Sequence, residues 1–448
     1  MRPFNRLWTA AAISNLGDGV TVVAGPLLLA TVSDSPALIA GGAFAAQLPW
    51  LLFSLVSGAV VDRLDRRRLI VTVDLLRGGV LAGLAVVIAS GHVSVPLIYL
   101  ASFLLGVGET LADTAYGALL PAVVPAAELE RANARLGATF TIANQFVAKP
   151  FGAWLYGVAA AVPFGLDAAT FVAAAVLIAG LPRVNLVPGE SEKHRDRPTG
   201  SRPADTASAA HGAPTPADDG TAEAPPAALD AAVGSVAQAD ARPGGGLRPE
   251  IAEGLRWLGG QRLLRALAVA MGVANIAFCA AFAVFVLYAR ERLGLTDVGY
   301  GFLLTTFAVG GLAGAGIAAR LARRSGTATI LRAGLIVEVV THLTLALTTS
   351  PLIAGGIIVI FGVHTMIWGV LVAAIRQRTV PDHLRGRVGS VFGLVETGGA
   401  AIGWLLGAVF TQLWDVTTPF WIAAFAMLAV TAAAWRSLSL AGRSTSRP

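Results

Sequence analysis

The chain alternates between long apolar runs and short polar connections, and this pattern predicts membrane-spanning helices. An apolar segment of about 20 residues is long enough to cross a bilayer as a helix. Twelve runs of this kind are expected, six on each side of a long polar stretch. In the first half they cover residues 7–31, 36–61, 69–90, 94–119, 132–160 and 163–182. In the second half they cover residues 262–289, 298–320, 328–348, 352–376, 387–412 and 417–436.

The fold class predicted from this pattern is an all-α membrane protein with twelve transmembrane helices in two six-helix bundles. Between the bundles, residues 184–248 are rich in Ala, Pro, Asp, Ser and Gly and have very few large apolar residues. Such a segment buries too little apolar surface to offset its ordering entropy. We therefore expect an N-terminal bundle at 1–183, a disordered cytoplasmic linker at 184–248 and a C-terminal bundle at 249–448. The stretch PEIAEGLRWL at 249–258 has the pattern of a short amphipathic helix.

Composition agrees with a membrane protein and narrows the function classes. Hydrophobic residues make up 55% of the chain and charged residues 13%, whereas soluble domains carry about 25% charged residues. The net charge is +6, but the arginines lie between apolar runs, so membrane topology explains them and nucleic acid binding is not predicted. Cys279 is the only cysteine, which excludes a disulfide framework and a Cys-rich metal site. The chain has no nucleotide-binding G-x-x-x-x-G-K-[ST] motif, zinc-ligand spacing or nucleophile elbow. The prediction is a protein that is not an enzyme and has no cofactor.

The arginines are distributed unevenly between the two sides of the membrane. If the N-terminus is cytoplasmic, nearly all basic residues of the short connections lie inside, whereas the outer connections hold only Arg290 and Arg292. Lys and Arg near span ends resist translocation. We therefore predict a multi-pass protein of the cytoplasmic (inner) membrane with both termini in the cytoplasm.

The connection after the second predicted span carries a motif, GAVVDRLDRRR, from Gly58 to Arg68. It resembles the signature loop G-x-x-x-D-R-x-G-R-[KR] between helices 2 and 3 of the major facilitator superfamily. The matching positions are Gly58, Asp62, Arg63, Arg66 and Arg67, and the second glycine of the signature is Asp65 here. The alternative is a charge cluster that only sets topology.

Other strings resemble the branch of this superfamily that holds macrolide efflux proteins and the enterobactin exporter. They are SNLGDG at 14–19, EGLRWL at 253–258 and QRTVPDHLRGRV at 377–388. Drug antiporters of a neighbouring branch carry G-x-x-x-G-P-x-x-G-G in span 5. The chain reads QFVAKPFGAW at 145–154, with Lys149 in place of the glycine before the proline.

The resemblance implies a secondary active transporter that alternates between inward-open and outward-open forms by rocking two halves. The function expected from it is proton-coupled efflux of an amphipathic small molecule, such as an antibiotic or a siderophore-like metabolite. A nutrient or lipid carrier is the alternative within the fold, and a non-transporting membrane sensor is the alternative outside it. The expected partners are a small-molecule substrate, protons and the lipid bilayer, and the chain is expected to be a monomer.

Ionisable residues inside the spans are the candidate cavity residues. Placing a charge at the bilayer centre costs about 2.5–3.5 kcal/mol on insertion scales, so such side chains should face a cavity or a partner. Asp18 lies midway along span 1. Glu109 and Asp113 lie four residues apart in span 4, hence on one helical face. Reversible protonation is the functional interpretation of these acids, and packing against Arg77 or a loop arginine is the structural one.

Further candidates come from later spans. Lys149 could pair with an acid or attract an anionic substrate. His364 and Glu396 lie in spans 10 and 11, where a histidine could titrate near neutral pH or serve as hydrogen-bonded filler. Glu338 and His342 are expected to form a local pair in span 9. The two halves repeat each other in sequence, since GIAARLARR at 316–324 echoes GAVVDRLDRR at 58–67. Matching Asn15 with Asn275 in this repeat places Phe278 at the position equivalent to Asp18, so only the first half has an acid there.

The signature loop also suggests a gate. In the superfamily's fold, spans 2 and 11 are neighbours, and a helix N-terminus carries about half a positive charge. Asp62 is therefore expected to bind the start of span 11, near Arg387, and to latch the halves together on the inside in the outward-open form. The arginines around Asp62 are expected to bind nearby acids such as Asp74.

Overall fold

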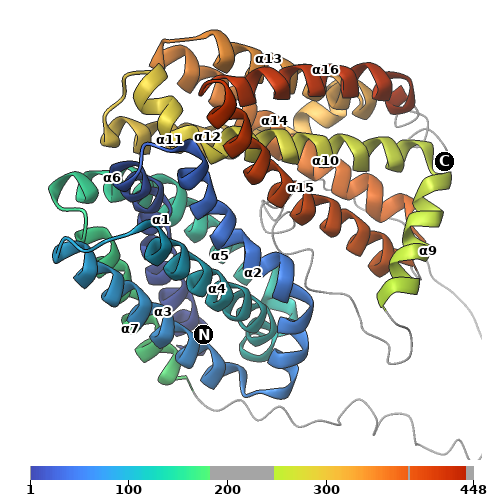
Figure 1. Ribbon diagram of the computed structural model, residues 1–448. Coiled ribbons are helices and arrows are strands. Elements are labelled where there is room, and N and C mark those ends of the chain that lie inside the picture. The colour runs from blue at the N-terminus through green and yellow to red at the C-terminus, as the bar shows by residue number, and fades with distance from the viewer. Residues whose placement is uncertain (1, 182–246, 382–383, 440–448) are drawn as a thin grey trace, which may run out of the picture.

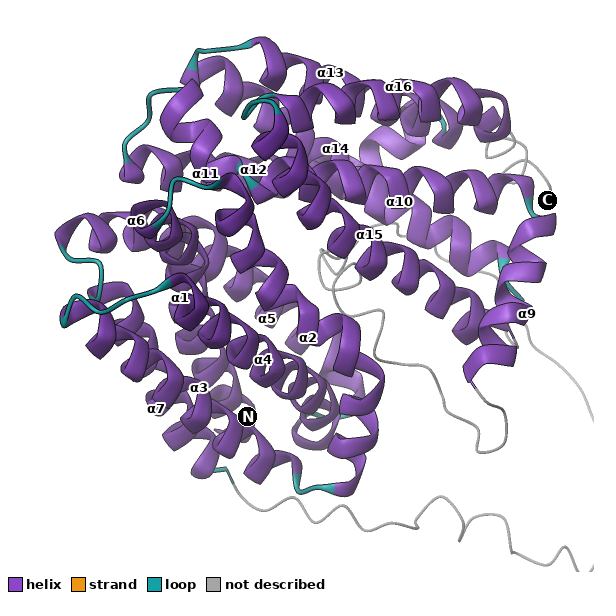
Figure 2. Ribbon diagram, in the orientation of Figure 1, coloured by secondary structure: helices purple, strands orange, loops and turns teal. Residues whose placement is uncertain are grey.

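The computed structural model describes residues 2–181, 247–381 and 384–439, and in these ranges the regular elements are helices (Figures 1 and 2). Almost all of the predicted linker lies outside the described residues. The first half holds α1 (Arg2–Val32), α2 (Pro36–Arg63), α3 (Arg66–Ala89), α4 (Val95–Val123), η1 (Ala126–Glu128), α5 (Leu129–Phe140), η2 (Thr141–Ala148), α6 (Lys149–Val158) and α7 (Val162–Ala179). The second half holds α9 (Leu247–Gly260), α10 (Arg262–Ala283), α11 (Phe285–Leu287), η3 (Tyr288–Arg292), α12 (Asp297–Ser325), α13 (Thr327–Leu347), α14 (Pro351–Thr379), α15 (Arg385–Leu413) and α16 (Thr418–Leu438).

The all-α membrane fold predicted from the apolar runs is confirmed. In the described ranges, eleven helices are long and apolar enough to cross a membrane. The remaining predicted span, 132–160, is divided into α5, η2 and α6, which follow one another without a break from Leu129 to Val158. The middle piece, η2, is a π-helix, and turns of this kind inside α-helices are frequent at functional sites. The predicted span 262–289 is likewise divided, because Val284 has a non-helical conformation with φ −116° between α10 and α11.

Glycines allow the helices of the second half to cross at close range. A Cβ atom at Gly310 of α12 would lie 2.0 Å from the carbonyl oxygen of Val359 in α14. A Cβ atom at Gly407 of α15 would lie 2.2 Å from the carbonyl oxygen of Ala280 in α10. A Cβ atom would clash at both contacts, so these glycines let the helix backbones touch.

The two halves are joined at one end of the molecule and separate at the other. We call the end with the α2–α3 connection the loop end and the opposite end the far end. At the far end one apolar cluster contains residues of both halves, such as Leu27 and Tyr156 with Tyr288 and Phe420. At the loop end each half has its own cluster: one is confined to residues of the first half and the other to residues of the second. Figure 1 shows the same arrangement, with the bundles meeting near α6, α11 and α12 and diverging toward α9.

Contacts between named residues agree with this arrangement. Ser35, just before α2, donates a hydrogen bond to Gln412 near the end of α15, with 3.1 Å between the two oxygens. A Cβ atom at Gly301 of α12 would lie 2.8 Å from the carbonyl oxygen of Lys149 in α6. Both contacts lie in the far half of the molecule, which closes the space between the bundles there.

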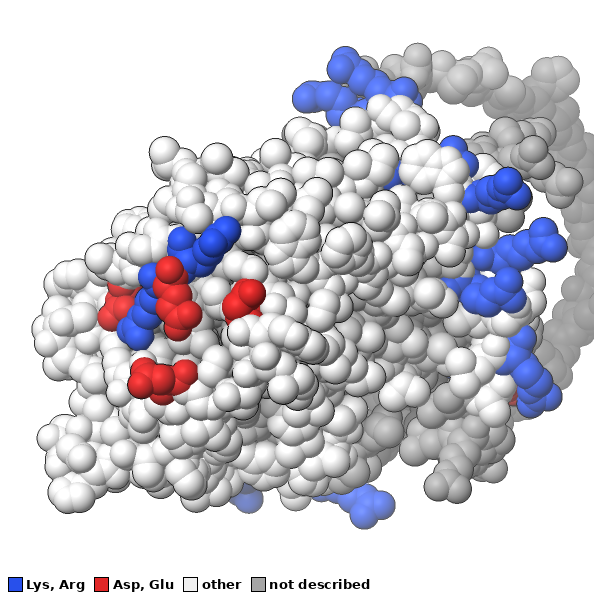
Figure 3. Space-filling model, turned by 45° about the horizontal axis from the view of Figure 1, so that its top comes forward, with Lys and Arg blue, Asp and Glu red and all other residues white. Residues whose placement is uncertain are grey.

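The surface charges are gathered at the two ends. On the face in Figure 3, Lys and Arg collect at one end, acidic and basic side chains lie together at the other, and a broad, largely uncharged band separates them. A lipid-facing surface requires such a band, because charges are costly in hydrocarbon.

The short helix predicted at 249–258 is confirmed as α9, which packs against α15 and α10. Glu253 of α9 forms an ion pair with Arg387 of α15, with 2.6 Å between the charged atoms. A Cβ atom at Gly254 would lie 2.8 Å from the carbonyl oxygen of Arg387. The helix after the predicted linker is therefore fixed to the start of α15.

Candidate proton and substrate site

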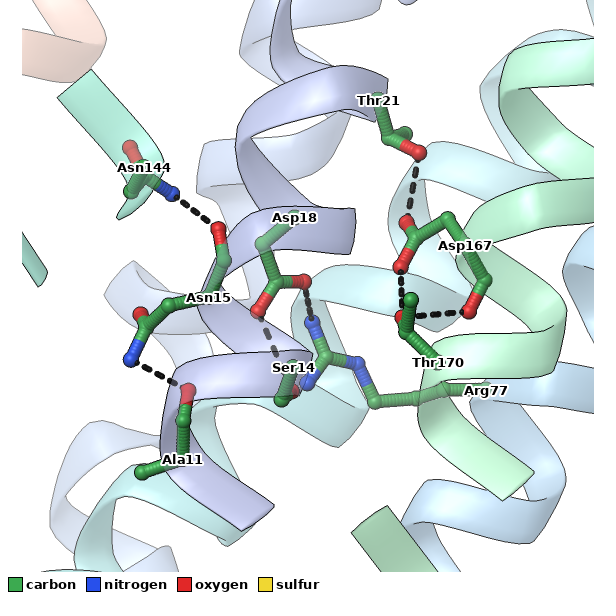
Figure 4. A network of polar contacts seen from close by, with 9 residues as sticks. All are labelled: Ala11, Ser14, Asn15, Asp18, Thr21, Arg77, Asn144, Asp167 and Thr170. Atoms are coloured by element: carbon green, nitrogen blue, oxygen red, sulfur yellow. Dashed lines mark hydrogen bonds and ion pairs between the residues drawn. The ribbon is translucent and has the colours of Figure 1, made fainter. Parts of the chain in front are cut away.

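A buried arginine of α3 is the centre of the polar network in the first half (Figure 4). Arg77 donates to Asp18 of α1 at 2.9 Å, and the Arg77 side chain is only 8% exposed, compared with 29% for Asp18. The guanidinium also lies over the ring of Phe171, 4.1 Å from its centroid. Ser14, one turn before Asp18, lies at the edge of hydrogen-bonding range of the carboxylate, at 3.4 Å. Asp18 is thus both paired and partly open to solvent.

A second acid, Asp167 of α7, lies beside this pair. Thr21 of α1 donates to Asp167 at 2.5 Å, and Thr170 donates to it at 3.0 Å. A Cβ atom at Gly17 would lie 2.1 Å from an Asp167 carboxylate oxygen. Gly17, the first glycine of the SNLGDG string, therefore lets α7 bring its carboxylate against α1.

Asp74 lies one helical turn before Arg77 on α3 and is 1% exposed. Within the described residues, its Oδ2 atom has no hydrogen-bond partner, and the same holds for Arg77 Nε and the Tyr116 hydroxyl. Asp74 interacts electrostatically with Arg77. Charged and polar atoms at this depth are usually hydrogen-bonded, so this part of the network is less well satisfied than the Asp18 and Asp167 parts.

Two further acids near Arg77, Glu109 and Asp113, lie on α4. Both side chains are exposed, yet both interact electrostatically with Arg77 and Asp18, so they lie on the inner side of α4. The Trp50 side chain of α2 is within hydrogen-bonding reach of Glu109. Five carboxylates, from Asp18, Asp74, Glu109, Asp113 and Asp167, therefore surround one arginine; we call this set the Arg77 cluster.

The π-helix η2 helps to position Asp18. Asn144 in η2 donates to the backbone carbonyl of Asn15 at 3.0 Å, and a Cβ atom at Gly19 would lie 2.7 Å from the Asn144 carbonyl oxygen. Lys149, the first residue of α6, is buried and donates to Gln145. In the described part of the chain it forms no ion pair with Asp18, Glu109 or Asp113, so the expected pairing with an acid does not occur here.

The other two predicted cavity residues lie in the second half. His364 of α14 is buried and contacts Glu338 of α13, with 3.3 Å between His364 Nε2 and Glu338 Oε1. Glu396 of α15 is half-buried, and its backbone carbonyl accepts a hydrogen bond from Asn275 of α10. Glu396 also interacts electrostatically with Arg376. The structure therefore joins Asp18, Glu109 and Asp113 in one cluster and places Lys149, His364 and Glu396 outside it.

The second half presents a row of aromatic rings on α10. Phe278, Phe282 and Phe285 of α10 stack in sequence, with centroids 5.6 and 5.9 Å apart. Trp404 of α15 meets Phe282 edge-on at 5.8 Å and packs against a small apolar cluster that joins Ala40 of the first half to residues of α10 and α15. Phe278, the position equivalent to Asp18, is half-buried. The acidic side of the first half and the aromatic side of the second provide surfaces for a molecule with both polar and apolar parts.

Comparison with known families identifies the family. The family model described as Major Facilitator Superfamily matches residues 7–395 and 266–448. The chain belongs to the major facilitator superfamily. It is therefore a membrane transporter, as the signature loop predicted.

Relatives and solved structures agree with this membership. The multidrug efflux pump Tap of Mycolicibacterium fortuitum is 26% identical over 407 residues, which cover 89% of this chain and 86% of Tap. A bacterial homologue of the iron transporter ferroportin in its inward-facing state has a TM-score of 0.69 at 16% identity, covering 98% of this chain and 99% of that one. A bacterial ferroportin homologue in its outward-facing state has a TM-score of 0.57 at 17% identity, covering 98% of this chain and 100% of that one. At these identities the structures support the fold alone.

Two arginines of the superfamily signature loop connect α3 to α4 and α7 through hydrogen bonds. Arg66 donates to the carbonyl oxygen of Ala118 in α4 at 3.1 Å. Arg67 donates to the carbonyl oxygens of Ile178 and Ala179 at the end of α7. The last carbonyls of a helix lack intrahelical partners, so Arg67 caps the end of α7, whereas Arg66 binds a carbonyl in the last turns of α4. In the described contacts they bind carbonyls rather than Asp74, contrary to expectation. Arg63 is exposed. Gly58 and Asp62 lie in α2, and their side chains are outside the described set.

Sequence reasoning missed two members of the Arg77 cluster as site residues, Asp74 and Asp167. Asp167 stands alone in the predicted span 163–182, as Asp18 does in span 1, so the same criterion would have found it. Asp74 lies closer to the charged loop and was assigned to the loop arginines. Arg77 was considered only as a structural partner, whereas the structure places it at the centre.

Proposed function

We propose that this transporter exports amphipathic small molecules across the cytoplasmic membrane in exchange for inward-moving protons. The observation that carries the proposal is the imbalance of charge in the Arg77 cluster. One permanent cation faces five carboxylates, and an ionised carboxylate away from water needs a partner.

The five acids of the Arg77 cluster cannot all be ionised at once at low cost, because neighbouring like charges disfavour ionisation. The cluster is therefore suited to binding and releasing protons, and groups this close titrate as a coupled unit. Asp18, Glu109 and Asp113 have exposed surface from which a proton can pass to water. A substrate that binds beside them changes the charge balance, which is the physical basis for exchanging it against a proton.

Efflux is the direction supported by the relative Tap, a multidrug efflux pump that aligns over most of both chains. The aromatic rings of α10 and Trp404 supply apolar contact area in the second half, which suits an amphipathic molecule. A nutrient or lipid carrier of the same fold is the alternative, but no contact in the site favours it. Membership of a transporter family removes the reason to consider a membrane sensor.

The direction of opening follows from the proposed orientation. If the arginine-rich loop end is cytoplasmic, the halves are open toward the cytoplasm and closed at the outer face. Rocking of the halves about the far-end contacts would then expose the site to the outside, as expected for parallel six-helix repeats.

The test is dye transport in everted membrane vesicles that contain the full chain, with ethidium as the first amphipathic probe. Vesicles acidified inside should accumulate ethidium, and an uncoupler should abolish the accumulation. Asp18→Asn should remove the dependence on the pH gradient while folded protein remains in the membrane, and Glu109→Gln and Asp113→Asn should weaken it. Arg68→Gln, an exposed position, serves as the matched control. Full gradient-driven transport in all three acid variants would refute the proposed role of the cluster.

A further inference from the structure

A second group of titratable side chains lies in the other half of the molecule, between α13 and α14. Glu338 is 6% exposed, His342 3% and His364 9%. His364 Nε2 lies 3.3 Å from Glu338 Oε1. His342 Nδ1 lies 2.8 Å from the backbone carbonyl oxygen of Glu338 and 3.8 Å from Oε2. We call these three residues the Glu338 cluster.

The two imidazoles have different roles in the Glu338 cluster. A carbonyl oxygen only accepts hydrogen bonds, so His342 Nδ1 carries a hydrogen that it donates to the backbone of its own helix. His364 Nε2 faces the carboxylate oxygen itself. A hydrogen on either atom satisfies that contact, because the nitrogen can donate or accept and the carboxyl group can do the same. His342 therefore orients the cluster, and the Glu338–His364 contact is where a proton can be shared.

The packing around His364 is specific for its imidazole ring. A Cβ atom at Gly334 of α13 would lie 2.6 Å from two atoms of this ring, so the glycine makes room for it. Trp368 meets the ring at 5.7 Å and Phe361 at 6.2 Å between centroids. The imidazole is thus held between the backbone of α13 and two aromatic rings, with Nε2 directed at Glu338.

Permanent charges do not balance Glu338. The other charged groups on α13 and on the helices packed against it lie near the helix ends. They are Arg332 on α13, Asp297, Arg320, Arg323 and Arg324 on α12, Arg376 and Arg378 on α14, and Arg436 on α16. Arg332 donates to the carbonyl oxygen of Trp435, and Asp297 pairs with Arg290. Arg376 is twelve residues from His364 on the same helix, which corresponds to about 18 Å.

The number of protons therefore determines the charge of the cluster. Without a shared proton, Glu338 is a buried carboxylate between two neutral imidazoles, and Glu338 Oε2 has no hydrogen-bond partner among the described residues. With one shared proton the pair is neutral overall, either as carboxyl and imidazole or as carboxylate and imidazolium. Burial strongly disfavours a net charge, so the one-proton state fits the site.

We propose that Glu338 and His364 hold one proton between them and form a second proton-binding site of the transporter, in the half that lacks the Arg77 cluster. The proton leaves to water only when α13 and α14 separate enough to hydrate the pair. The pair keeps its proton while it is shielded from water and releases it when water reaches the pair. The second half would in this way carry a proton across the membrane. The site therefore adds one proton to each transport cycle.

Aromatic contacts connect this site to the substrate surface. The Phe361 ring lies 6.2 Å from both His342 and His364 and 6.0 Å from Phe278 of α10. One ring thus separates the Glu338 cluster from the residue equivalent to Asp18. A substrate that displaces Phe278 would act on the packing of His364 through Phe361.

The first experiment detects the proton directly in the purified full chain, in lipid nanodiscs at pH 7 without substrate. Nitrogen-15 NMR of labelled histidines reports whether His364 carries hydrogen on both ring nitrogens, and infrared spectroscopy reports a protonated Glu338 carboxyl; one of the two is expected. Glu338→Gln should speed solvent exchange of the shared hydrogen at least tenfold or remove the carboxyl band. His92→Asn, in the α3–α4 connection, is the control. An ionised Glu338 beside a neutral His364 imidazole, in either tautomer, would overturn the proposal.

The second experiment measures protons moved per ethidium in proteoliposomes. This part rests on the proposed function, whereas the NMR and infrared measurements do not. The ratio should fall by one in Glu338→Gln, or in His364→Asn if the first variant is inactive. An unchanged ratio of protons to ethidium would show that the site does not carry a proton during transport, even if the first experiment finds a bound proton. If the wild type shows no gradient-driven ethidium transport, the efflux proposal is refuted. The proton-binding site would then be judged by the NMR and infrared measurements alone.

Discussion

Arg77 of α3 and Asp18 of α1 form an ion pair of 2.9 Å in the interior of the first half. Removing one partner of a buried pair usually costs about 3–5 kcal/mol. Arg77 also compensates four further acids, whereas Asp18 has only one cation. We therefore expect Arg77→Met to lower the thermal unfolding midpoint in detergent more than Asp18→Asn does. The double variant should be more stable than the sum of the single effects predicts.

The control for this cycle is Arg68→Gln, whose side chain is exposed. It should leave the unfolding midpoint within error of the wild type. Equal effects of Arg77→Met and Asp18→Asn, combined with strict additivity in the double variant, would show that the pair is not coupled.

Close helix crossings predict a second effect. Gly310→Val should destabilise the folded chain by about 1–3 kcal/mol or more, since overpacking usually costs this much. The reason is that a Cβ atom at this position would lie 2.0 Å from the Val359 carbonyl oxygen. The neighbouring Gly311 has nothing within 4 Å of its Cβ position. Gly311→Val is therefore the matched control and should fold normally. Thermal unfolding and the yield of monodisperse protein would separate the two. Equal yields would contradict the packing argument.

A third prediction concerns acid pH and the connection between α15 and α16. Hydrogen bonds from the Thr417 hydroxyl and backbone N–H, at 2.7 and 2.6 Å, hold the pKa of Asp415 below its ordinary value. A lowered carboxyl pKa stabilises the folded state at all pH values above the ordinary value of about 4. This contribution is lost as the pH falls from there through the folded-state pKa.

Hydrogen exchange at the Thr417 amide would measure this effect. Protection should decrease as the pH falls below about 4, after correction for the intrinsic exchange rate. Asp415→Asn should give protection that no longer changes across this pH range, because an amide does not titrate there, while Thr417→Ser should keep the wild-type profile. A wild-type profile in Asp415→Asn would contradict the assignment.

The signature loop gives a fourth prediction. Asp62 is expected to bind the N-terminus of α15 when the loop ends of the halves close. The helices concerned, α2 and α15, are neighbours across the two halves, as the superfamily resemblance implied. A charge–dipole contact is worth up to about 2 kcal/mol, so Asp62→Asn should shift the carrier toward the form that is open at the loop end. Distances between spin labels on the loop ends of α2 and α15 would report this shift. The same distance distribution in wild type and variant would leave the loop as a topological signal.

Orientation is the fifth prediction. The arginine asymmetry places 184–248 on the cytoplasmic side. Protease added to intact spheroplasts should leave this segment uncut, whereas protease added to inverted vesicles should cut it. Cleavage from outside would reverse the orientation and the assignment of the open end.

Much of the fold is encoded locally in the sequence. Apolar length predicts the spans, because each helix satisfies its own backbone hydrogen bonds in lipid. The signature loop at Gly58–Arg68 predicts the family, and the amphipathic pattern at 249–258 predicts α9. Asp18, Glu109 and Asp113 could be chosen as site residues because an acid within an apolar span needs a partner.

Which acids share a partner was decided by the tertiary structure. Arg77 meets carboxylates from α1, α3, α4 and α7, and His364 meets Glu338 from the neighbouring α13. Helical periodicity predicts which residues of one helix share a face, but the rotation of one helix against another depends on its contacts. Here those contacts are close approaches at glycines such as Gly17 and Gly334, where another helix fills the place of a side chain. The opening at the loop end also depends on contacts between the two halves, which are distant in the sequence.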